Sequence, residues 1–137
     1  MPQGDFRGYG TLRKHVLDFY RAWNSLDMRD LAPFYSKAPD VIIFNDVEPV
    51  KFRGWKEFKE AEEKIMAKFS HWKVTPKDLK LLTWGDVALT TATPLLTGES
   101  KAGKRYNLTL RHTAAWERMD NVWLIIHDHW SIPWPSS

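Results

Sequence analysis

The spacing of the apolar residues changes once along the chain, and this change constrains the fold more than any other feature. Up to about residue 70 the apolar residues recur mostly at helical spacing, interrupted by one short extended stretch. From Trp72 to Pro133 they follow strand-like alternation. The order is two helices, a β-hairpin, a helix and four long strands. It predicts an α+β fold, with one cone-shaped, curved antiparallel sheet packed on three N-terminal helices around a central pocket.

The boundaries of these elements follow from the same spacing and from local stop signals. Asp27 is a plausible N-cap for the second helix, and Pro33 should kink that helix or end it early. Irregularities near Pro76 and Pro94 should help the sheet to curve. The helices are expected at residues 11–26, 28–35 and 55–70, the hairpin at 41–44 and 50–53, and the long strands at 72–84, 87–97, 106–119 and 122–132.

The composition is that of one globular domain spanning residues 1–137. The absence of cysteine excludes disulfides and thiolate metal sites, while eight tryptophans suggest an aromatic pocket or an interface. There is no apolar run of transmembrane length and no signal-peptide core, so we expect a cytoplasmic protein without membrane contact. The net charge is only +3, and acids alternate with bases along residues 56–64, so we expect no nucleic-acid partner.

The last strand carries a row of polar side chains. Strict alternation places His127, His129 and Ser131 on one face of this strand. A tight turn at residues 120–121 would bring Arg111 and Thr113 of the preceding strand beside them. We therefore expect these five side chains to form one wall of the pocket.

This wall has two interpretations. In the first, Arg111 holds an anionic or enolate-like oxygen, and His127 or His129 moves a proton near neutral pH. In the second, the same side chains form a structural hydrogen-bond network without chemistry. The two histidines have a spacing that can also chelate a metal ion, but no third-ligand motif is present, so we expect neither a metal site nor a cofactor.

Asp46 follows the first short strand, where the chain turns back over the sheet. At the rim of an aromatic pocket its carboxylate would have a raised pKa and act as a general base. As an ordinary turn residue it would instead accept hydrogen bonds from nearby backbone amides. The aromatic candidates for ligand contact are equally consistent with the core; the candidate ligand-binding residues are Tyr20, Trp23, Phe44, Phe58, Thr113 and Ser131.

The other face of the last strand carries the apolar side chains of Ile126, Trp130 and Ile132. If the helices occupy the concave side of the sheet, these residues lie on the convex side. An apolar patch there would need cover from a second subunit, so we expect a homodimer packed sheet to sheet.

Residues 110–133 also resemble a known family. Arg111-His-Thr113, the turn, Trp123, the aliphatic pair and His127-Asp-His-Trp-Ser-Ile-Pro133 are similar to the last hairpin of SnoaL-like, ketosteroid-isomerase-like proteins of the nuclear transport factor 2 superfamily. The turn differs, with Asn121 in place of glycine, and asparagine tolerates the left-handed conformation that the turn needs. Phe44-Asn-Asp46, Pro49 and Phe52-Arg-Gly-Trp55 resemble the hairpin before the third helix. The last hairpin is also similar to the association domain of calcium/calmodulin-dependent kinases.

The resemblance implies the α+β cone, a pocket and a dimer, but it does not fix an activity. The isomerase's catalytic carboxylates are not recognisable at matching positions. The leading hypothesis is binding of a small apolar or carboxylate-bearing organic molecule, with cofactor-independent isomerase, cyclase or dehydratase chemistry by Asp46, His127, His129 and Arg111. The alternative is a non-catalytic ligand-binding or oligomerisation module.

Overall fold

The computed structural model describes residues 6–135, with side chains from residue 11 onward. The N-terminal half contains helix α1 (Phe6–Ala22), the 3-10 turn η1 (Trp23–Ser25), α2 (Met28–Leu31), the 3-10 turn η2 (Ala32–Phe34), strands β1 (Ile42–Phe44) and β2 (Phe52–Arg53), and helix α3 (Gly54–Met66). The C-terminal half contains β3 (Phe69–Thr75), β4 (Lys80–Trp84), β5 (Val87–Ala92), β6 (Leu95–Ser100), β7 (Arg105–Thr109), β8 (Arg111–Met119) and β9 (Val122–Ser131).

Local signals in the sequence explain the helix boundaries. The side chain of Asp27 accepts a hydrogen bond from the Arg29 backbone N–H at 2.9 Å, which confirms the predicted N-cap. The α-helix ends before Pro33, as expected, and continues as the 3-10 turn η2. Helix α3 ends at Met66 rather than near residue 70, because Phe69 already starts β3.

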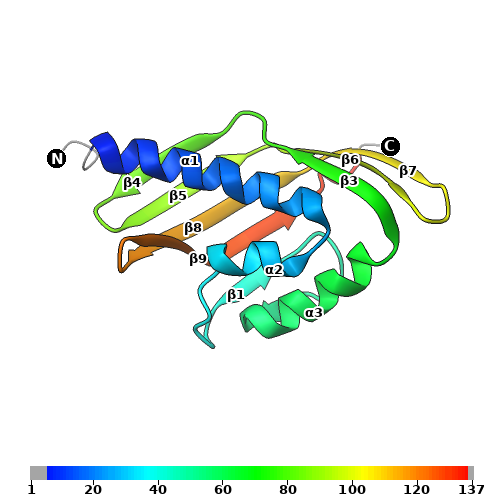
Figure 1. Ribbon diagram of the computed structural model, residues 1–137, viewed down its shortest axis with the longest axis horizontal. Helices are drawn as coiled ribbons and strands as arrows, with labels where there is room; N and C mark the ends of the chain where they lie inside the picture. The colour runs from blue at the N-terminus through cyan, green and yellow to red at the C-terminus, as the bar shows by residue number, and fades with distance from the viewer. Residues whose placement is uncertain (1–5, 136–137) are drawn as a thin grey trace.

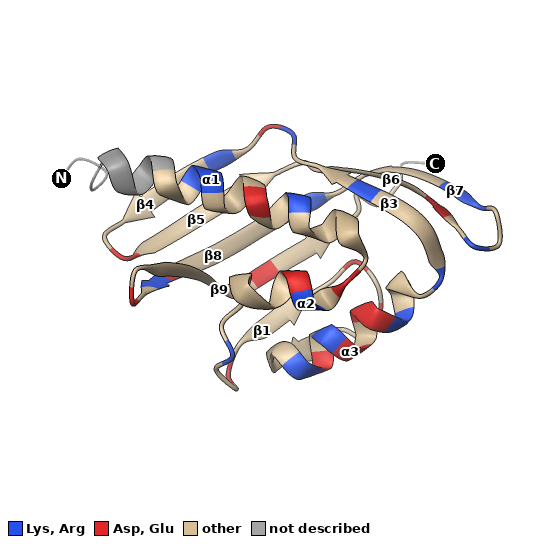
Figure 2. Cartoon of the chain, in the orientation of Figure 1, with Lys and Arg blue, Asp and Glu red and all other residues tan. Residues whose placement is uncertain are grey.

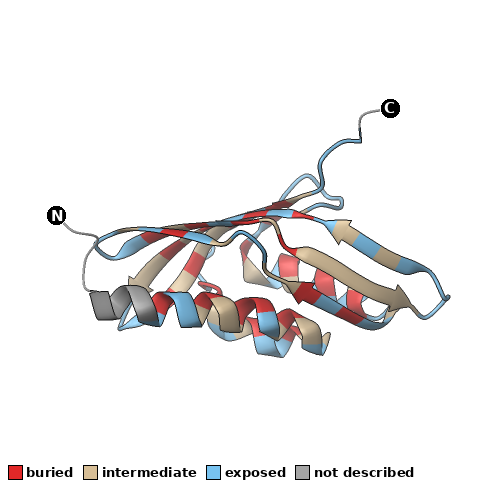
Figure 3. Cartoon of the chain, turned by 90° about the horizontal axis from the view of Figure 1, so that it is seen from above, coloured by how far each residue is buried: buried red, intermediate tan, exposed pale blue. Residues whose placement is uncertain are grey.

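The strands form two sheets that curve around one side of the helices (Figure 1). A six-stranded sheet has the order β2-β1-β9-β8-β5-β4, and a three-stranded sheet has the order β3-β6-β7. Every pair is antiparallel except β1 with β9, which is parallel, so the six-stranded sheet is mixed. The helices lie on one face of the six-stranded sheet and leave the other face uncovered (Figure 3). The predicted α+β fold, a curved sheet on three helices, is confirmed.

Three of the predicted long strands are each divided into two. The breaks fall at residues 76–79, 93–94 and 110, between β3 and β4, β5 and β6, and β7 and β8. They lie side by side, because Thr93 N–H donates to the Lys77 carbonyl at 2.9 Å and Leu110 N–H donates to the Pro94 carbonyl at 2.8 Å. The three breaks therefore form one line across the strands. On the far side of this line, β3, β6 and β7 form the three-stranded sheet, which extends toward α3 (Figure 1).

A β-bulge changes the alternation within β9. Ala115 lies opposite His127, but the next residue, Trp116, lies opposite Ile125, so Ile126 is an extra residue. Before the bulge, the odd-numbered residues of β9 are buried under the helices. After it, the even-numbered residues Asp128 and Trp130 are buried instead.

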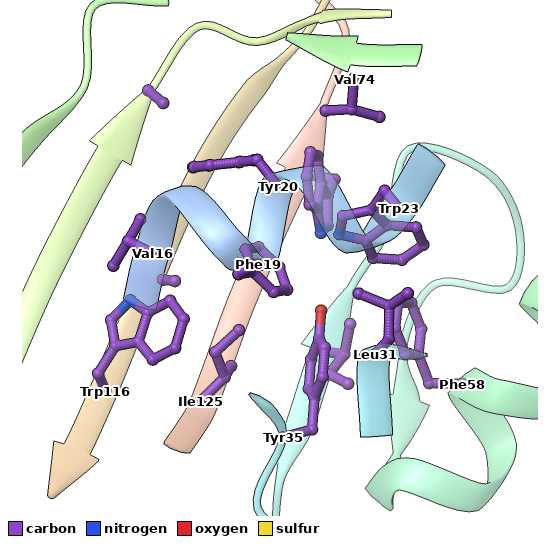
Figure 4. Packing of buried hydrophobic residues seen from close by; sticks show 14 of the residues in the cluster. Val16, Phe19, Tyr20, Trp23, Leu31, Tyr35, Phe58, Val74, Trp116 and Ile125 are labelled. Atoms are coloured by element: carbon purple, nitrogen blue, oxygen red, sulfur yellow. The ribbon is translucent and has the colours of Figure 1, made fainter. Parts of the chain in front are cut away.

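The core lies between α1, η1, α3 and the inner sheet face, and it is rich in aromatic rings. Phe19 packs between the rings of Tyr20, Tyr35 and Trp116, with centroid distances of 5.2–5.9 Å (Figure 4). Basic and acidic residues are spread along α3 (Figure 2). Of these charged residues, Glu62 alone is buried. This exception is explained by the cavity described below.

Candidate functional site

The predicted polar wall forms, but on the outer face of the six-stranded sheet. Thr113 lies opposite His129, and Arg111 Nε donates a hydrogen bond to Ser131 Oγ at 3.0 Å, so these residues do meet as expected. Arg111, Thr113 and His129 are exposed, however, and none of the five wall residues lines the main cavity. The bulge at Ile126 is the reason, because it turns His127, His129 and Ser131 away from the helices. The expected placement of the wall in the pocket is therefore corrected.

The inner face of the same two strands carries a buried polar network centred on Asp128. Its Oδ2 atom accepts hydrogen bonds from Tyr35 Oη at 2.7 Å, His112 Nε2 at 3.0 Å and Trp130 Nε1 at 3.1 Å. Three donors therefore converge on one carboxyl oxygen, while the other, Oδ1, is buried without a hydrogen-bond partner among the described residues. The network places this carboxyl group and its three donors beneath α1.

His112 extends this network to α1. Its Nδ1 atom lies 2.7 Å from Tyr20 Oη, and its ring stacks on Trp130 with a centroid distance of 3.8 Å. With His112 protonated on Nε2, the Tyr20 hydroxyl donates to Nδ1, so both ring nitrogens of the imidazole are hydrogen-bonded. Burial, and the nearby Asp128, raise the pKa values of Tyr20 and Tyr35, so both phenols stay protonated. Tyr20, Tyr35, His112 and Asp128 are each at most 1% exposed, which indicates a structural role.

The main cavity lies on the other side of Trp130, between α3, the three-stranded sheet and the loop after β1. Its volume is about 380 Å³, within the range of small-molecule sites. Apolar and aromatic side chains form most of the wall, and the polar side chains come from the β1–β2 loop, α3, the turn between α3 and β3, and β7. The lining residues are Trp23, Asn45, Asp46, Val47, Glu62, Ile65, Lys68, Phe69, Trp72, Val74, Leu96, Tyr106, Leu108, Leu110, Trp130 and Ile132.

Glu62 is the buried acid of this cavity, with only 5% of its surface exposed. Burial raises its pKa to about 8, and the neighbouring Asp46 and Asp128 raise it as well, against the lowering effect of the Asn45 hydrogen bond. Asn45 Nδ2 donates to Glu62 Oε1 at 2.5 Å. Near neutral pH, Glu62 is therefore mostly protonated and can donate a proton inside the cavity.

Asp46 lies at the mouth of the same cavity, next to Asn45. Its side chain is exposed on one side, but the atoms around the mouth remove part of its hydration and raise its pKa. A backbone hydrogen bond opposes this rise. Asp46 thus lies at the rim of an aromatic cavity with a raised pKa, beside a second carboxyl group, Glu62, that was not among the predicted site residues.

The four aromatic candidates for ligand contact are separated by the structure. Trp23 lines the cavity. Tyr20 and Phe58 are fully buried in the core and are not lining residues, which corrects their expected placement. Phe44 lies beside the outer-face histidines, with its ring centroid 5.3 Å from those of both His127 and His129, so it too is away from the cavity.

The helical spacing of α3 indicates that Glu62 is buried, although a charged residue is usually expected on the solvent side. Phe58 and Met66 belong to the buried stripe of α3, and Glu62 lies four residues from each of them. Residues four apart share one face of a helix, so Glu62 had to point inward. An acid in the middle of an apolar stripe is therefore the pattern that marks this site.

The described helices include none that is both long and apolar enough to cross a membrane. A family model for the SnoaL-like domain matches residues 12–135 of the chain. The sequence matched no functionally curated protein.

Solved structures with low sequence identity share the fold. An NTF2-like protein of unknown function from Pseudomonas putida superposes with a TM-score of 0.81 at 20% identity, over 96% of this chain and 90% of that one. A proposed calcium/calmodulin-dependent protein kinase II association domain from Xanthomonas campestris gives 0.75 at 23% identity, over 95% and 89%. A type 2 hexachlorocyclohexane dehydrochlorinase gives 0.76 at 14% identity, over 95% and 90%. These similarities concern the architecture.

Proposed function

The chain belongs to the SnoaL-like domain family, and we propose that it binds a small organic molecule in the cavity beside α3 and carries out acid–base chemistry on it. The observation that carries the proposal is Glu62, a carboxyl group with a raised pKa inside an aromatic cavity and next to a second carboxyl group, Asp46. Perturbed acids in a concave apolar site are typical of catalytic groups.

The two carboxyl groups would take different roles. Glu62, protonated near neutral pH, would donate a proton to an oxygen or leaving group of the ligand. Asp46, which is more exposed to solvent, would accept a proton from carbon or oxygen. Isomerisation, dehydration and cyclisation each need one such donor and one such acceptor. The dehydrochlorinase among the structural relatives is named for an elimination from an apolar ring compound, which supports elimination chemistry in this fold.

The protonation of Glu62 can be tested before any substrate is known. Carbon-13 NMR of the glutamate carboxyl groups should show one that titrates near pH 8, and this signal should disappear in Glu62→Gln. Glu63→Gln is the matched control, because Glu63 is exposed on the same helix. If every glutamate titrates between about 4 and 5, the proposed acid is ionised at neutral pH and the assignment fails.

Once a substrate is found, both carboxyl variants should lose activity. Glu62→Gln and Asp46→Asn are each expected to lower kcat/KM by about 10²–10⁴-fold, the usual contribution of a general acid or base. His129→Ala should leave it unchanged, because His129 lies on the outer sheet face. Loss of activity only in His129→Ala would contradict this assignment and would indicate that the reaction takes place on the outer sheet face.

A second role, assembly, is favoured by the uncovered outer face of the six-stranded sheet. Leu82 pairs with Leu89, and Leu89 lies opposite Ala115, which forms one apolar row across three strands. Trp84, at the edge of the sheet, is 61% exposed. Such a face favours a second copy packed sheet to sheet, although through different residues than expected. Trp130 lies on the inner face, Ile126 lies in the bulge and Ile132 lines the cavity.

The dimer is tested by a charge on the most exposed large side chain of this face. Trp84→Glu should weaken the self-association measured by sedimentation velocity at least about thirtyfold, because a buried anchor is lost and a charge is desolvated. Val50→Glu is the matched control, since Val50 is 87% exposed but belongs to the β1–β2 loop. A monomer at micromolar concentration for the unmodified chain would exclude the dimer.

A further inference from the structure

Most polar side chains of the cavity carry hydrogen-bond acceptors, and one exception is Trp23 Nε1, a buried donor without a partner among the described residues. Asn45, Asp46 and Glu62 gather their oxygens on one side. Lys68 is the one basic side chain among the lining residues, and it is exposed, two residues beyond the end of α3. Arg111, the residue expected to hold an anionic ligand, lies on the outer sheet face. The cavity interior therefore offers carboxyl groups without an internal cation.

One of these acceptors has no partner among the described side chains. Asn45 donates to Glu62 Oε1, which leaves Glu62 Oε2 without a protein hydrogen bond although the residue is almost fully buried and lines the cavity. Asn45 donates through its amide nitrogen, so its own oxygen remains an acceptor. The proximity of Asp46 makes a negative charge on Glu62 costly. A cation between the two carboxyl groups would remove that cost.

Aromatic rings supply the rest of a cation-binding environment. Trp23 and Trp130 meet edge to face, with a centroid distance of 5.6 Å. The ring centroid of Phe69 lies 5.0 Å from that of Trp72 and 5.1 Å from that of Tyr106. All five rings line the cavity. The π-faces of such rings attract ammonium groups, and aromatic cages bind organic cations in this way.

We propose that the ligand of this cavity is a hydrophobic amine, with its ammonium group between Asp46 and Glu62 and its apolar body against the tryptophans. The proposal rests on the proposed function, because it assumes that the cavity takes a small organic molecule, but it changes the role of Glu62, which is ionised once the ammonium is bound and then accepts a proton instead of donating one. An ammonium has three N–H donors, which match the free oxygens of Glu62, Asp46 and Asn45. A divalent metal ion fits less well, because calcium and magnesium need six or more oxygen ligands and the aromatic wall supplies none.

Ammonium binding is coupled to the proton on Glu62. The titratable groups that face Glu62 from other elements are Asp46 on the β1–β2 loop, Asp128 on β9 and Tyr35 before β1. An ammonium group favours the ionised form of Glu62, whose pKa is about 8 in the free protein. Binding at pH 7 should therefore release a proton, and the affinity should rise with pH up to about 8. A carboxylate ligand would show the opposite dependence.

The experiment compares three probes of similar size that differ in charge: tryptamine, tryptophol and indole-3-acetate. Isothermal titration calorimetry at pH 6, 7 and 8 measures their affinities, and two buffers of different ionisation enthalpy measure proton release. Tryptamine should bind most tightly, with release of a proton at pH 7. Its affinity should rise by up to about tenfold between pH 6 and 7, since each unit below the pKa of Glu62 lowers the ionised fraction about tenfold.

The variants separate this proposal from the more general one. Glu62→Gln should weaken tryptamine binding by about tenfold or more and remove its pH dependence, while Glu63→Gln should change neither. Tighter or equal binding of tryptophol or indole-3-acetate would overturn the amine proposal alone. Displacement of tryptamine by calcium would also overturn it. If none of the three probes binds, the result contradicts both the amine proposal and the proposed small-molecule site.

Discussion

Asp128→Ala is expected to lower the free energy of unfolding by about 3–5 kcal/mol, because a buried polar network loses the acceptor that its donors share. The substitution leaves the donors of Tyr35, His112 and Trp130 without their shared acceptor. Each buried donor without a partner destabilises the native state by about 1–3 kcal/mol. These three donors come from separate parts of the chain, so the loss should affect the whole fold. Urea denaturation measures it directly.

The control for this prediction is another aspartate in an ion pair. Asp86 accepts hydrogen bonds from Arg118 at 2.8 and 3.0 Å, but it is well exposed. Asp86→Ala should therefore change the free energy of unfolding by less than about 1 kcal/mol. If Asp128→Ala is too unstable to purify, Asp128→Asn keeps the volume and should show a smaller loss. Equal effects at positions 86 and 128 would contradict the structural role of the network.

Sequence alternation grouped the right residues of each strand but placed them on the wrong face of the sheet. The turn at Asp120 and Asn121 has two positive φ values, 51° and 63°, as a tight hairpin requires, and it sets Met119 opposite Val122, a register that would place Arg111 opposite Trp130. One extra residue at Ile126 shifts this register, so that Arg111 lies opposite Ser131, and it inverts every later position of β9. A bulge of this kind leaves no composition signal in a run of aliphatic residues. The polar row was therefore assigned to the cavity, and the His112–Asp128 pair was missed.

The overall order of elements was predictable because it depends on long apolar patterns, whereas the cavity depends on where strands bend. Pro76 and Pro94 indicated two of the three breaks, but Leu110, the third, is an ordinary strand residue. The three-stranded sheet that covers the cavity exists because all three breaks coincide. Such an alignment depends on pairing between distant segments, and the sequence of one segment cannot show it.

Glu62→Gln is expected to make the protein more stable, and increasingly so as the pH rises. The carboxyl group has an ordinary pKa near 4.5 in the unfolded chain and about 8 in the folded one. Between these values the native state retains a proton that the unfolded state has lost, so native stability falls by up to roughly 1.4 kcal/mol per pH unit. Glutamine is neutral throughout, can still accept the Asn45 hydrogen bond, and avoids this loss.

The measurement is urea denaturation of the unmodified chain and of Glu62→Gln at pH 5, 6, 7 and 8. The difference between the two should grow across this range and level off above about pH 8, where Glu62 is ionised in both states. The exposed Glu63→Gln should show no such trend. A difference that is constant between pH 5 and 8 would mean that Glu62 titrates normally. A residue that destabilises its own fold at the working pH is typical of a site retained for function, since an apolar or amide side chain at this position would serve the core better.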